Sequence, residues 1–388
     1  MKLTFGYIFG AMILPNLILL YLWYRVVFPR KNMKPICRLL CYLTLIFFAI
    51  NPFLFLIVGG NKVYPKLPPL FIEFSGLAFF VLVIFAFFIW LKDVFSLLSR
   101  ILAKFFSCKS LGFSLSKKFM ATAFAIAFAL ACYGNYCAHR LPIVTEYTVE
   151  SESLPSSFNG FKIALVTDIH AWRGQGKDFV QSVVDITNAQ HCQLVLLGGD
   201  YLDETIADLG EALLPLKSLK SQVGIYAVPG NHEYYLDYSE WKRFFEEKLN
   251  IPVLINQHKM IVSSANQAIF LTGISDESAK HTGDKMPDVK RALPVFGFPV
   301  FNILLSHRPN NAKRNCKLGV NLQLSGHTHG GILPFLSKII CFFHAGGYVA
   351  GEYKLDNMTL IVSRGANGGN IRIMNPAEIV VVTLKCRK

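Results

Sequence analysis

The chain has 388 residues, of which 53% are hydrophobic, and a formal net charge of +14. This hydrophobic content lies above the usual globular range and places part of the chain in lipid. The first 140 residues carry 15 Lys and Arg against 2 Asp and Glu, and the remainder carry 24 against 23, so the charge divides as +13 and +1. A nucleic-acid binder needs its basic patch on the folded domain, whereas basic residues beside apolar segments favour anionic headgroups. We therefore predict membrane lipids as partners and exclude nucleic acid.

Residues 1–140 are predicted to form a transmembrane region of four helices. Four apolar stretches are each near or above the ~20 residues that cross a ~30 Å hydrocarbon core; they are 5–28, 36–59, 68–92 and 118–138. A cleaved signal peptide is the alternative for the first stretch, but its apolar run is too long and no small-residue cleavage site follows it. We therefore expect a multi-pass integral membrane protein.

The basic residues of this region also predict its orientation. The connections 25–38 and 92–118 hold five and six Lys or Arg, against two in 60–67. Basic loops stay cytoplasmic, so everything after Arg140 should lie on the external face. Apolar residues at helical spacing within 92–118 suggest an interfacial helix, with an ordinary helical loop as the alternative.

Residues 141–160, rich in Ser and Glu, are predicted to be a polar linker, and 161–388 an α/β domain. In this second part short apolar runs alternate with helix-length segments. The predicted strands are 161–167, 194–197, 224–228, 253–262, 268–273, 301–306, 322–325, 359–363 and 379–384; the predicted helices are 177–190, 208–218, 239–249 and 288–292. Consecutive β-runs between 250 and 275 exclude a purely parallel sheet, so we expect two mixed sheets packed face to face between helices.

Polar residues follow five of these strands at the point where each strand ends. They are Asp168 and His170, Asp200, Asn231 with His232 and Glu233, His307, and His327 with His329. Taken singly, an Asp after a strand is more often a helix N-cap, and Asn-His is more often a turn. Ligand sites of α/β sheets lie beyond the carboxyl ends of strands, so five such ends should converge. Because they offer only oxygen and nitrogen ligands and no Cys, they predict a metal site.

Taken in order, these blocks resemble the calcineurin-like metallophosphoesterases over about residues 160–385. The family's blocks Asp-x-His, Gly-Asp-x-x-Asp, Gly-Asn-His-Glu, a lone His and Gly-His-x-His are matched by Asp168/His170, Gly199–Asp203, Gly230–Glu233, His307 and Gly326–His329. The resemblance implies a four-layer α/β/β/α fold. It also implies two divalent transition-metal ions, which could be Mn, Fe or Zn.

The resemblance further implies a role for each matched residue. Asp168, His170 and His329 would hold one metal ion, and Asn231, His307 and His327 the other. Asp200 would bridge the two ions. His232 would stand beside the phosphate as a transition-state stabiliser or a proton donor to the leaving group, while Asp203 and Glu233 would support the site through hydrogen bonds.

Residues 359–384 resemble the Ser-Arg-Gly and Pro-x-Glu-Ile ending of a membrane-associated subgroup. That subgroup includes UDP-2,3-diacylglucosamine pyrophosphohydrolases of lipid A synthesis and exported envelope enzymes. We predict a phosphoesterase of the bacterial cytoplasmic (inner) membrane that hydrolyses a phosphodiester or pyrophosphate bond of a lipid-linked or cell-envelope substrate. Two alternatives stay open: the UDP-2,3-diacylglucosamine activity itself, and a non-catalytic metal-binding membrane scaffold.

Two further features leave alternatives open. The apolar segment 333–343 directly follows Gly-His-Thr-His-Gly-Gly and is either core or a membrane contact that admits a lipid substrate. Cys192, Cys316, Cys341 and Cys386 could form disulfides only in an oxidising compartment.

Overall fold

The structure is a computed structural model that describes residues 13–30, 33–58, 66–111, 114–295, 300–331, 345–369 and 371–387. The chain divides into two compact units, Met1–Tyr136 and Cys137–Lys388. The segment 333–343, with Cys341, lies outside the described residues. Cys192, Cys316 and Cys386 are free thiols.

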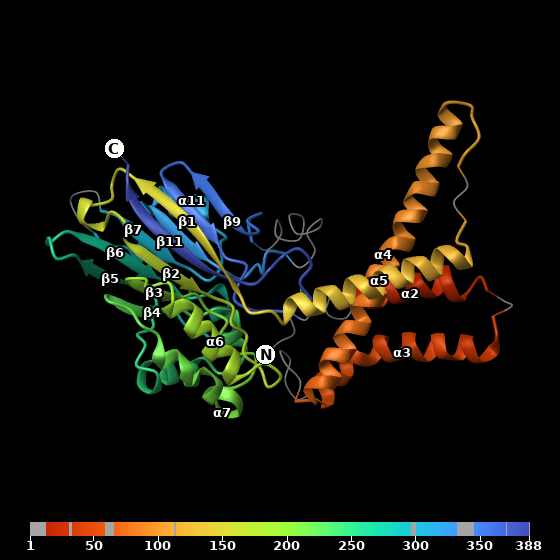
Figure 1. Cartoon of the computed structure of the whole chain (residues 1–388), viewed down its shortest axis with the longest axis horizontal. Helices are drawn as coiled ribbons and strands as arrows, with labels where there is room; N and C mark the ends of the chain where they lie inside the picture. The colour runs from red at the N-terminus through yellow and green to blue at the C-terminus, as the bar shows by residue number, and fades with distance from the viewer. Residues whose placement is uncertain are drawn as a thin grey trace. The chain divides into compact units, whose positions relative to one another are not determined.

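The described part of the first unit is helical (Figure 1). Its elements are α2 (Leu14–Leu22), the π-helical turn η2 (Trp23–Val27), α3 (Pro35–Val58), α4 (Pro69–Phe105) and α5 (Lys117–Ala138), whose last two residues belong to the second unit. Large apolar side chains are exposed on α2, α4 and α5, among them Leu20, Trp90 and Phe128. Extended apolar surfaces of this kind mark contact with a membrane or a partner.

Two of the four predicted spans are borne out as helices that are long and apolar enough to cross a membrane. They are α4 and α5, and only 28% and 22% of their most apolar windows are buried. The prediction of four such helices is not borne out. The first stretch, 5–28, is described only from residue 13, and its helical part is the short apolar helix Leu14–Val27. In the second, the apolar helix with described side chains covers Pro35–Ile50, although the backbone helix runs on to Val58.

The first part of the amphipathic stretch 92–118 is not a separate helix. Residues 92–105 are the end of α4, which runs unbroken from Pro69 to Phe105.

A charged cluster lies among the apolar helices of the first unit. Arg25 donates to both oxygens of Asp93 at 2.7 and 2.5 Å, and the Tyr21 hydroxyl donates to the same carboxylate at 2.8 Å. Charged groups inside apolar helices generally pair in this way.

The second unit contains two mixed β-sheets (Figure 1). The first has the strand order β1-β11-β2-β3-β4, and its strands are β1 (Ile143–Ser151), β2 (Lys162–Val166), β3 (Leu194–Leu197), β4 (Gly224–Ala227) and β11 (Glu378–Cys386). The second has the order β5-β6-β7-β8-β10-β9, and its strands are β5 (Gln257–Val262), β6 (Ala268–Gly273), β7 (Asn302–Leu305), β8 (Leu322–Ser325), β9 (Gly351–Leu355) and β10 (Met358–Val362). The strands β2, β3 and β4 are parallel, as are β6, β7, β8 and β10.

The alternation of side chains along these strands explains why helices cover both outer faces. Side chains at i and i+2 face the same way in a strand, so Ile163 and Leu165 enter the core between the sheets, while Ala164 and Val166 face a helical layer. That layer is formed by α6 (Lys177–Asn188), α7 (Ile206–Leu209), η4 (Gly210–Ser218), α9 (Tyr238–Arg243) and η5 (Phe244–Lys248). On the other sheet Leu304 and Leu360 face α10 (Val289–Ala292) and α11 (Ala312–Lys317). The predicted architecture of two mixed sheets between helices is confirmed.

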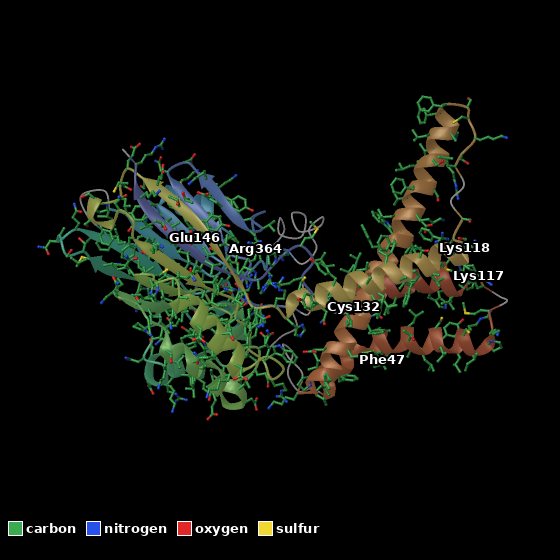
Figure 2. The ribbon with its side chains drawn as sticks, viewed as in Figure 1. Phe47, Lys117, Lys118, Cys132, Glu146 and Arg364 are labelled. Atoms are coloured by element: carbon green, nitrogen blue, oxygen red, sulfur yellow. The ribbon has the colours of Figure 1, made fainter. Side chains whose placement is uncertain are left out.

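The predicted linker at 141–160 is wrong over most of its length. Residues 143–151 form β1, which pairs in parallel with β11 along its whole length, and Ser156–Phe158 form a 3-10 turn. The edge strand is also fixed by side chains: Thr145 Oγ1 donates to Glu378 Oε2 at 2.6 Å, and Arg364, labelled in Figure 2, forms an ion pair with the same carboxylate. The strand β9 and the helix α11 were likewise not predicted.

Candidate metal centre

The polar residues predicted at five strand ends converge at one end of the two sheets. Asp168 and His170 follow β2, Asp200 follows β3, Asn231 and His232 open the short helix α8 (Asn231–Tyr235) after β4, His307 follows β7, and His327 and His329 follow β8. Five of them have a left-handed backbone, with φ between 42° and 72°; they are Asp168, His170, Asp200, His327 and His329. Non-glycine residues rarely adopt this conformation, and such strain gathers at functional sites.

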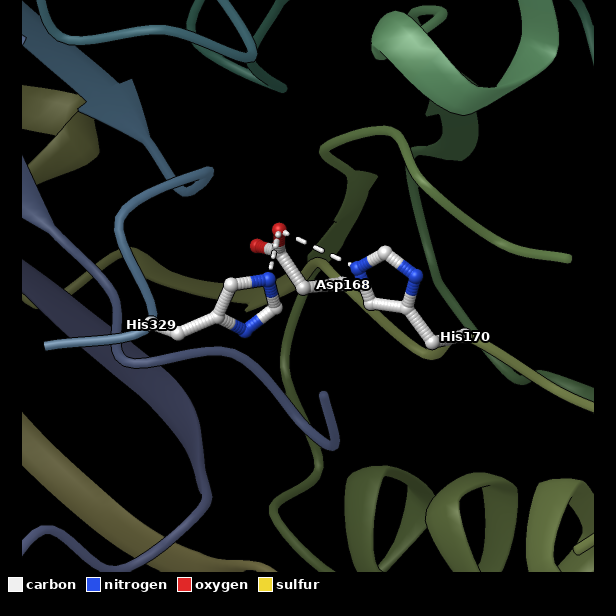
Figure 3. Close-up of side chains that lie close together, drawn as sticks. All are labelled: Asp168, His170 and His329. Carbon is white, nitrogen blue, oxygen red and sulfur yellow. Dashed lines mark ion pairs between the residues drawn. The ribbon is translucent and has the colours of Figure 1, made fainter. Parts of the chain in front are cut away.

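The donor atoms form three overlapping groups, each compact enough to hold a metal ion. The groups are Asp168 with His170 and His329, His170 with Asp200 and His232, and Asp200 with His307 and His327. In the first group the Nε2 atoms of His170 and His329 lie 3.8 and 3.5 Å from Asp168 Oδ1 (Figure 3). In the third, His307 Nε2 lies 3.2 Å from Asp200 Oδ2 and 3.2 Å from Asn231 Oδ1. All seven predicted ligand residues therefore lie in one cluster.

Three of the imidazoles are oriented by a hydrogen bond from Nδ1. His170 Nδ1 donates to Asp203 Oδ1 at 2.6 Å, His307 Nδ1 to the Gly198 carbonyl at 2.8 Å, and His329 Nδ1 to the Asn367 carbonyl at 3.1 Å. These oxygens accept, so Nδ1 carries a proton and Nε2 is the nitrogen that faces the cluster. This is the arrangement that metal-binding histidines normally have.

Asp203 connects the cluster to His232. Its Oδ1 atom accepts a second hydrogen bond, from His232 Nδ1 at 2.6 Å, so that one carboxylate orients both His170 and His232. His232 Nε2 lies 3.9 Å from Asp200 Oδ2. The ring of His232 is less enclosed than its partner, with 20% of its side chain exposed against 7% for His170. His232 is thus placed between the donor cluster and solvent.

Glu233 holds two of the strand-end loops together. Its carboxylate accepts from the backbone nitrogens of Asp200, Tyr201 and Gly230 at 2.9, 2.9 and 2.7 Å. The absence of a side chain at Gly230 lets the two loops lie this close, because a Cβ there would stand 2.1 Å from Asp200 Oδ1. Burial and the charge of Asp200 raise the pKa of Glu233 to about 7, despite its three backbone donors.

His327 differs from the other imidazoles in its partner. Arg308 Nη1 donates to His327 Nε2 at 2.8 Å, and Arg308 itself is held by Asp276 Oδ2 at 2.7 Å. Burial and the charge of Arg308 lower the pKa of His327 well below its usual value. The ring is therefore neutral, as a metal ligand must be.

The carboxylates and imidazoles of the cluster shift each other's pKa values. Burial raises the pKa of Asp168, but His329 and His170 outweigh it and hold this pKa at about 2. Burial lowers the pKa of His307, but the charge of Asp200 outweighs it and raises the pKa to about 9. Protonated imidazole thus neutralises carboxylate in this cluster. A cation that binds here would release those protons, as cations do at most protein metal sites.

The donor set fits divalent cations. The ligands are oxygen and nitrogen atoms, which suits Mn, Fe or Zn. His170 Nε2 is buried, faces both Asp168 and Asp200, and has no hydrogen-bond partner within the described residues. A buried polar atom without a partner is costly, and a cation at this point removes that cost.

One segment of the site, the loop after β10, was given no role from the sequence. The loop after β10 covers the first donor group: the backbone nitrogens of Ala366 and Asn367 donate to the carbonyls of Thr167 and Asp168 at 2.8 and 2.9 Å. Its signal is the Ser-Arg-Gly sequence, but the contacts run through backbone atoms, which leave no trace in the residue pattern.

Comparison with known proteins agrees with this geometry. Residues 161–331 match the calcineurin-like phosphoesterase family. A transmembrane protein with metallophosphoesterase domain from Danio rerio is 30% identical over 325 residues, which are 81% of this chain and 73% of that one. The chain belongs to the calcineurin-like phosphoesterases. These are metal-dependent phosphoester hydrolases, and the predicted resemblance is confirmed.

Other phosphoesterases match the same part of the chain. An uncharacterized metallophosphoesterase from Aquifex aeolicus is 30% identical over 269 residues, 67% of this chain and 98% of that one. A Caenorhabditis elegans protein named as a metallophosphoesterase is 33% identical over 276 residues, 68% of this chain but 56% of its own length. The match therefore spans a little over half of the worm relative.

Replacing Asp203 with Asn should weaken metal binding about 10- to 100-fold, the usual effect of removing a partner of a metal-binding histidine. The same change should lower turnover, because His232 loses the carboxylate that orients it. Metal affinity is measured by calorimetric titration of the full chain in detergent. The matched control is Glu204→Gln: Glu204 is also buried, but it pairs with Arg173 and is hydrogen-bonded to none of these imidazoles. Equal effects of the two variants would contradict the role given to Asp203.

Proposed function

We propose that this chain is a membrane-anchored phosphoesterase that uses two divalent cations to hydrolyse a phosphodiester or pyrophosphate bond. One observation carries the proposal. Asp200 Oδ2 lies 3.6 Å from His170 Nε2 and 3.2 Å from His307 Nε2, so a single carboxylate oxygen adjoins both the first and the third donor group. A shared carboxylate is what a two-metal site requires to keep its ions close together.

The ligands divide between the two positions as the family resemblance implies. Asp168, His170 and His329 would hold one ion, Asn231, His307 and His327 would hold the other, and Asp200 would contribute to both positions. When bound, the ions would supply Lewis acidity, which would lower the pKa of the attacking water and offset charge on the phosphoryl oxygens. No Ser or Cys nucleophile is needed for this chemistry.

His232 serves as the proton donor to the leaving oxygen. Its Nδ1 proton is engaged by Asp203, which leaves Nε2 to hold the proton that is transferred. Asp203 fixes the ring orientation and offsets the positive charge of the protonated ring. Because Asp203 also orients His170, the acid and the metal ligand keep a fixed position relative to each other.

The substrate is proposed to be a phosphorylated lipid or a cell-envelope molecule. Support comes from the two long apolar helices α4 and α5, from relatives named as transmembrane proteins, and from the nearly neutral charge of residues 141–388, which gives no basis for nucleic-acid binding. The test uses full-length protein with Mn²⁺ and two substrates, a lipid pyrophosphate in vesicles and a soluble aryl phosphodiester. We expect turnover of both, with the higher kcat/KM for the lipid. Two bound ions with no turnover of either would favour the non-catalytic scaffold.

We propose that the chain is a bacterial inner-membrane protein whose catalytic unit lies on the external side. The helices α4 and α5 alone give the same orientation. Arg100 and Lys104 lie near the end of α4, Lys109 lies in the connection that follows, and Lys117 and Lys118 lie at the start of α5 (Figure 2). Positively charged connections stay in the cytoplasm. A reporter active only in the cytoplasm, fused after residue 388, should therefore be inactive, and one active only outside should work. The opposite result would refute the orientation and would favour the UDP-linked lipid substrate.

A further inference from the structure

Arg372 is a buried arginine in the loop between β10 and β11. The residue is 1% exposed, and it donates from Nη2 to the carbonyls of Arg364 and Asn367 and from Nη1 to the carbonyl of Asn375. Within the described residues its Nε has no hydrogen-bond partner. A buried charge held by carbonyls rather than a carboxylate costs several kcal/mol, so a role for this position is expected.

The carbonyl of Asn367 is the link between Arg372 and the metal centre. It accepts both from Arg372 Nη2 and from His329 Nδ1, the latter at 3.1 Å. His329 therefore keeps its proton on Nδ1 and turns Nε2 toward Asp168 Oδ1, 3.5 Å away (Figure 3). Without a fixed acceptor at Nδ1, the ring could take the other tautomer and lose its lone pair on the metal side.

The loop also packs closely on the same histidine from a second side. Asn375 Nδ2 donates to the His329 carbonyl, and Arg372 Nη1 holds the carbonyl of Asn375 at 3.2 Å. At Gly368 a Cβ would stand 2.2 Å from His329 Cε1, so side chain and loop leave no space between them. Arg372 thus connects two parts of the loop that both contact His329.

We propose that Arg372 is a positioning residue for the metal position formed by Asp168, His170 and His329. It fixes the Asn367 carbonyl, which in turn fixes the tautomer and the direction of His329. The planar guanidinium is required because it reaches three carbonyls at once, which a lysine ammonium on its flexible stem cannot do with the same geometry. The inference rests on the proposed two-metal function, and it explains how one ligand of one metal position is oriented.

The expected effect is selective. Arg372→Met should weaken binding of one of two Mn²⁺ ions about 10- to 100-fold and leave the other within about twofold, because the other position uses Asn231, His307 and His327. Arg372→Lys should lie between Met and wild type. The matched control is Arg364→Met, which removes a guanidinium from the same loop but breaks the ion pair with Glu378 rather than a contact to His329. That control should lower the thermal unfolding temperature and keep both Mn²⁺ affinities.

The experiment titrates Mn²⁺ into chelator-treated full-length protein and follows it by calorimetry, with turnover not used as the readout. His329→Ala identifies the affected position, and the double variant Arg372→Met/His329→Ala should bind Mn²⁺ no more weakly than His329→Ala alone, because Arg372 acts through His329. Additive losses in the double variant, equal losses at both positions, or the same loss in Arg364→Met would overturn the proposal. If Arg372→Met fails to fold, Arg372→Lys replaces it, and its Mn²⁺ affinity alone and combined with His329→Ala is compared in the same way. Wild type that binds no Mn²⁺ would instead refute the two-metal function itself.

Discussion

Replacing Asp200 with Asn is expected to abolish hydrolysis of a small phosphodiester while the α/β unit stays folded. Asp200 Oδ2 adjoins His170 and His307, one from each metal position, so the substitution removes negative charge from both. A neutral amide holds two dications poorly, and the loss of several kcal/mol of charge stabilisation lowers turnover ~10³-fold or more. The fold should survive, because Asp200 Oδ1 accepts from the His232 backbone nitrogen at 2.9 Å, and an amide oxygen accepts equally well.

The measurement is kcat/KM of the variant with saturating Mn²⁺, together with circular dichroism. Asp185→Asn is the matched control, since Asp185 lies exposed on α6 and away from the cluster. It should leave turnover unchanged. Near-normal turnover of Asp200→Asn with a full complement of metal would mean that the carboxylate does not bridge.

Replacing His232 with Ala should lower turnover about 10²- to 10⁴-fold, the range for a lost acid or base, without loss of metal. The physical reason is that Nδ1 of His232 is held by Asp203 and its Nε2 is free to give a proton to the leaving oxygen. The loss should be greatest for an alkyl leaving group, which needs a proton, and small for a nitrophenolate, which does not.

The diagnostic is therefore the ratio of the two rates in wild type and variant, with metal content measured on the same samples. His191→Ala, a change at an exposed histidine, serves as the control. A uniform loss across leaving groups would point to transition-state binding rather than proton donation. Loss of a metal ion in His232→Ala would make His232 a ligand, since it forms a compact donor group with His170 and Asp200.

The buried strands could be predicted from sequence because each is a short apolar run that enters a core. Residues 194–197 and 322–325 were placed to the residue for this reason. The edge strand β1 could not, because its sequence IVTEYTVES mixes polar and apolar residues without regular alternation, and most of its side chains are exposed or half-buried. Its place is decided by pairing with β11, more than 200 residues away. Such pairing is invisible to a local pattern.

The candidate ligand residues were predictable because metal chemistry restricts such residues to a few types at strand ends. The residues that orient them were less so. Asp203 belongs to the recognisable Gly-Asp-x-x-Asp block. Arg372, in contrast, acts through backbone carbonyls, which every sequence has, so no residue pattern marks its role. For the spans, length and apolar content were sufficient for α4 and α5, whereas the first two stretches give shorter apolar helices over their described parts.

The central claim is tested most directly by counting metal ions in the purified full-length protein. Elemental analysis of active wild type should give two divalent transition-metal ions per chain, and Asp200→Asn should give fewer under the same conditions. Hydrolysis of a phosphodiester by protein that contains no metal, even after treatment with a chelator, would contradict the account.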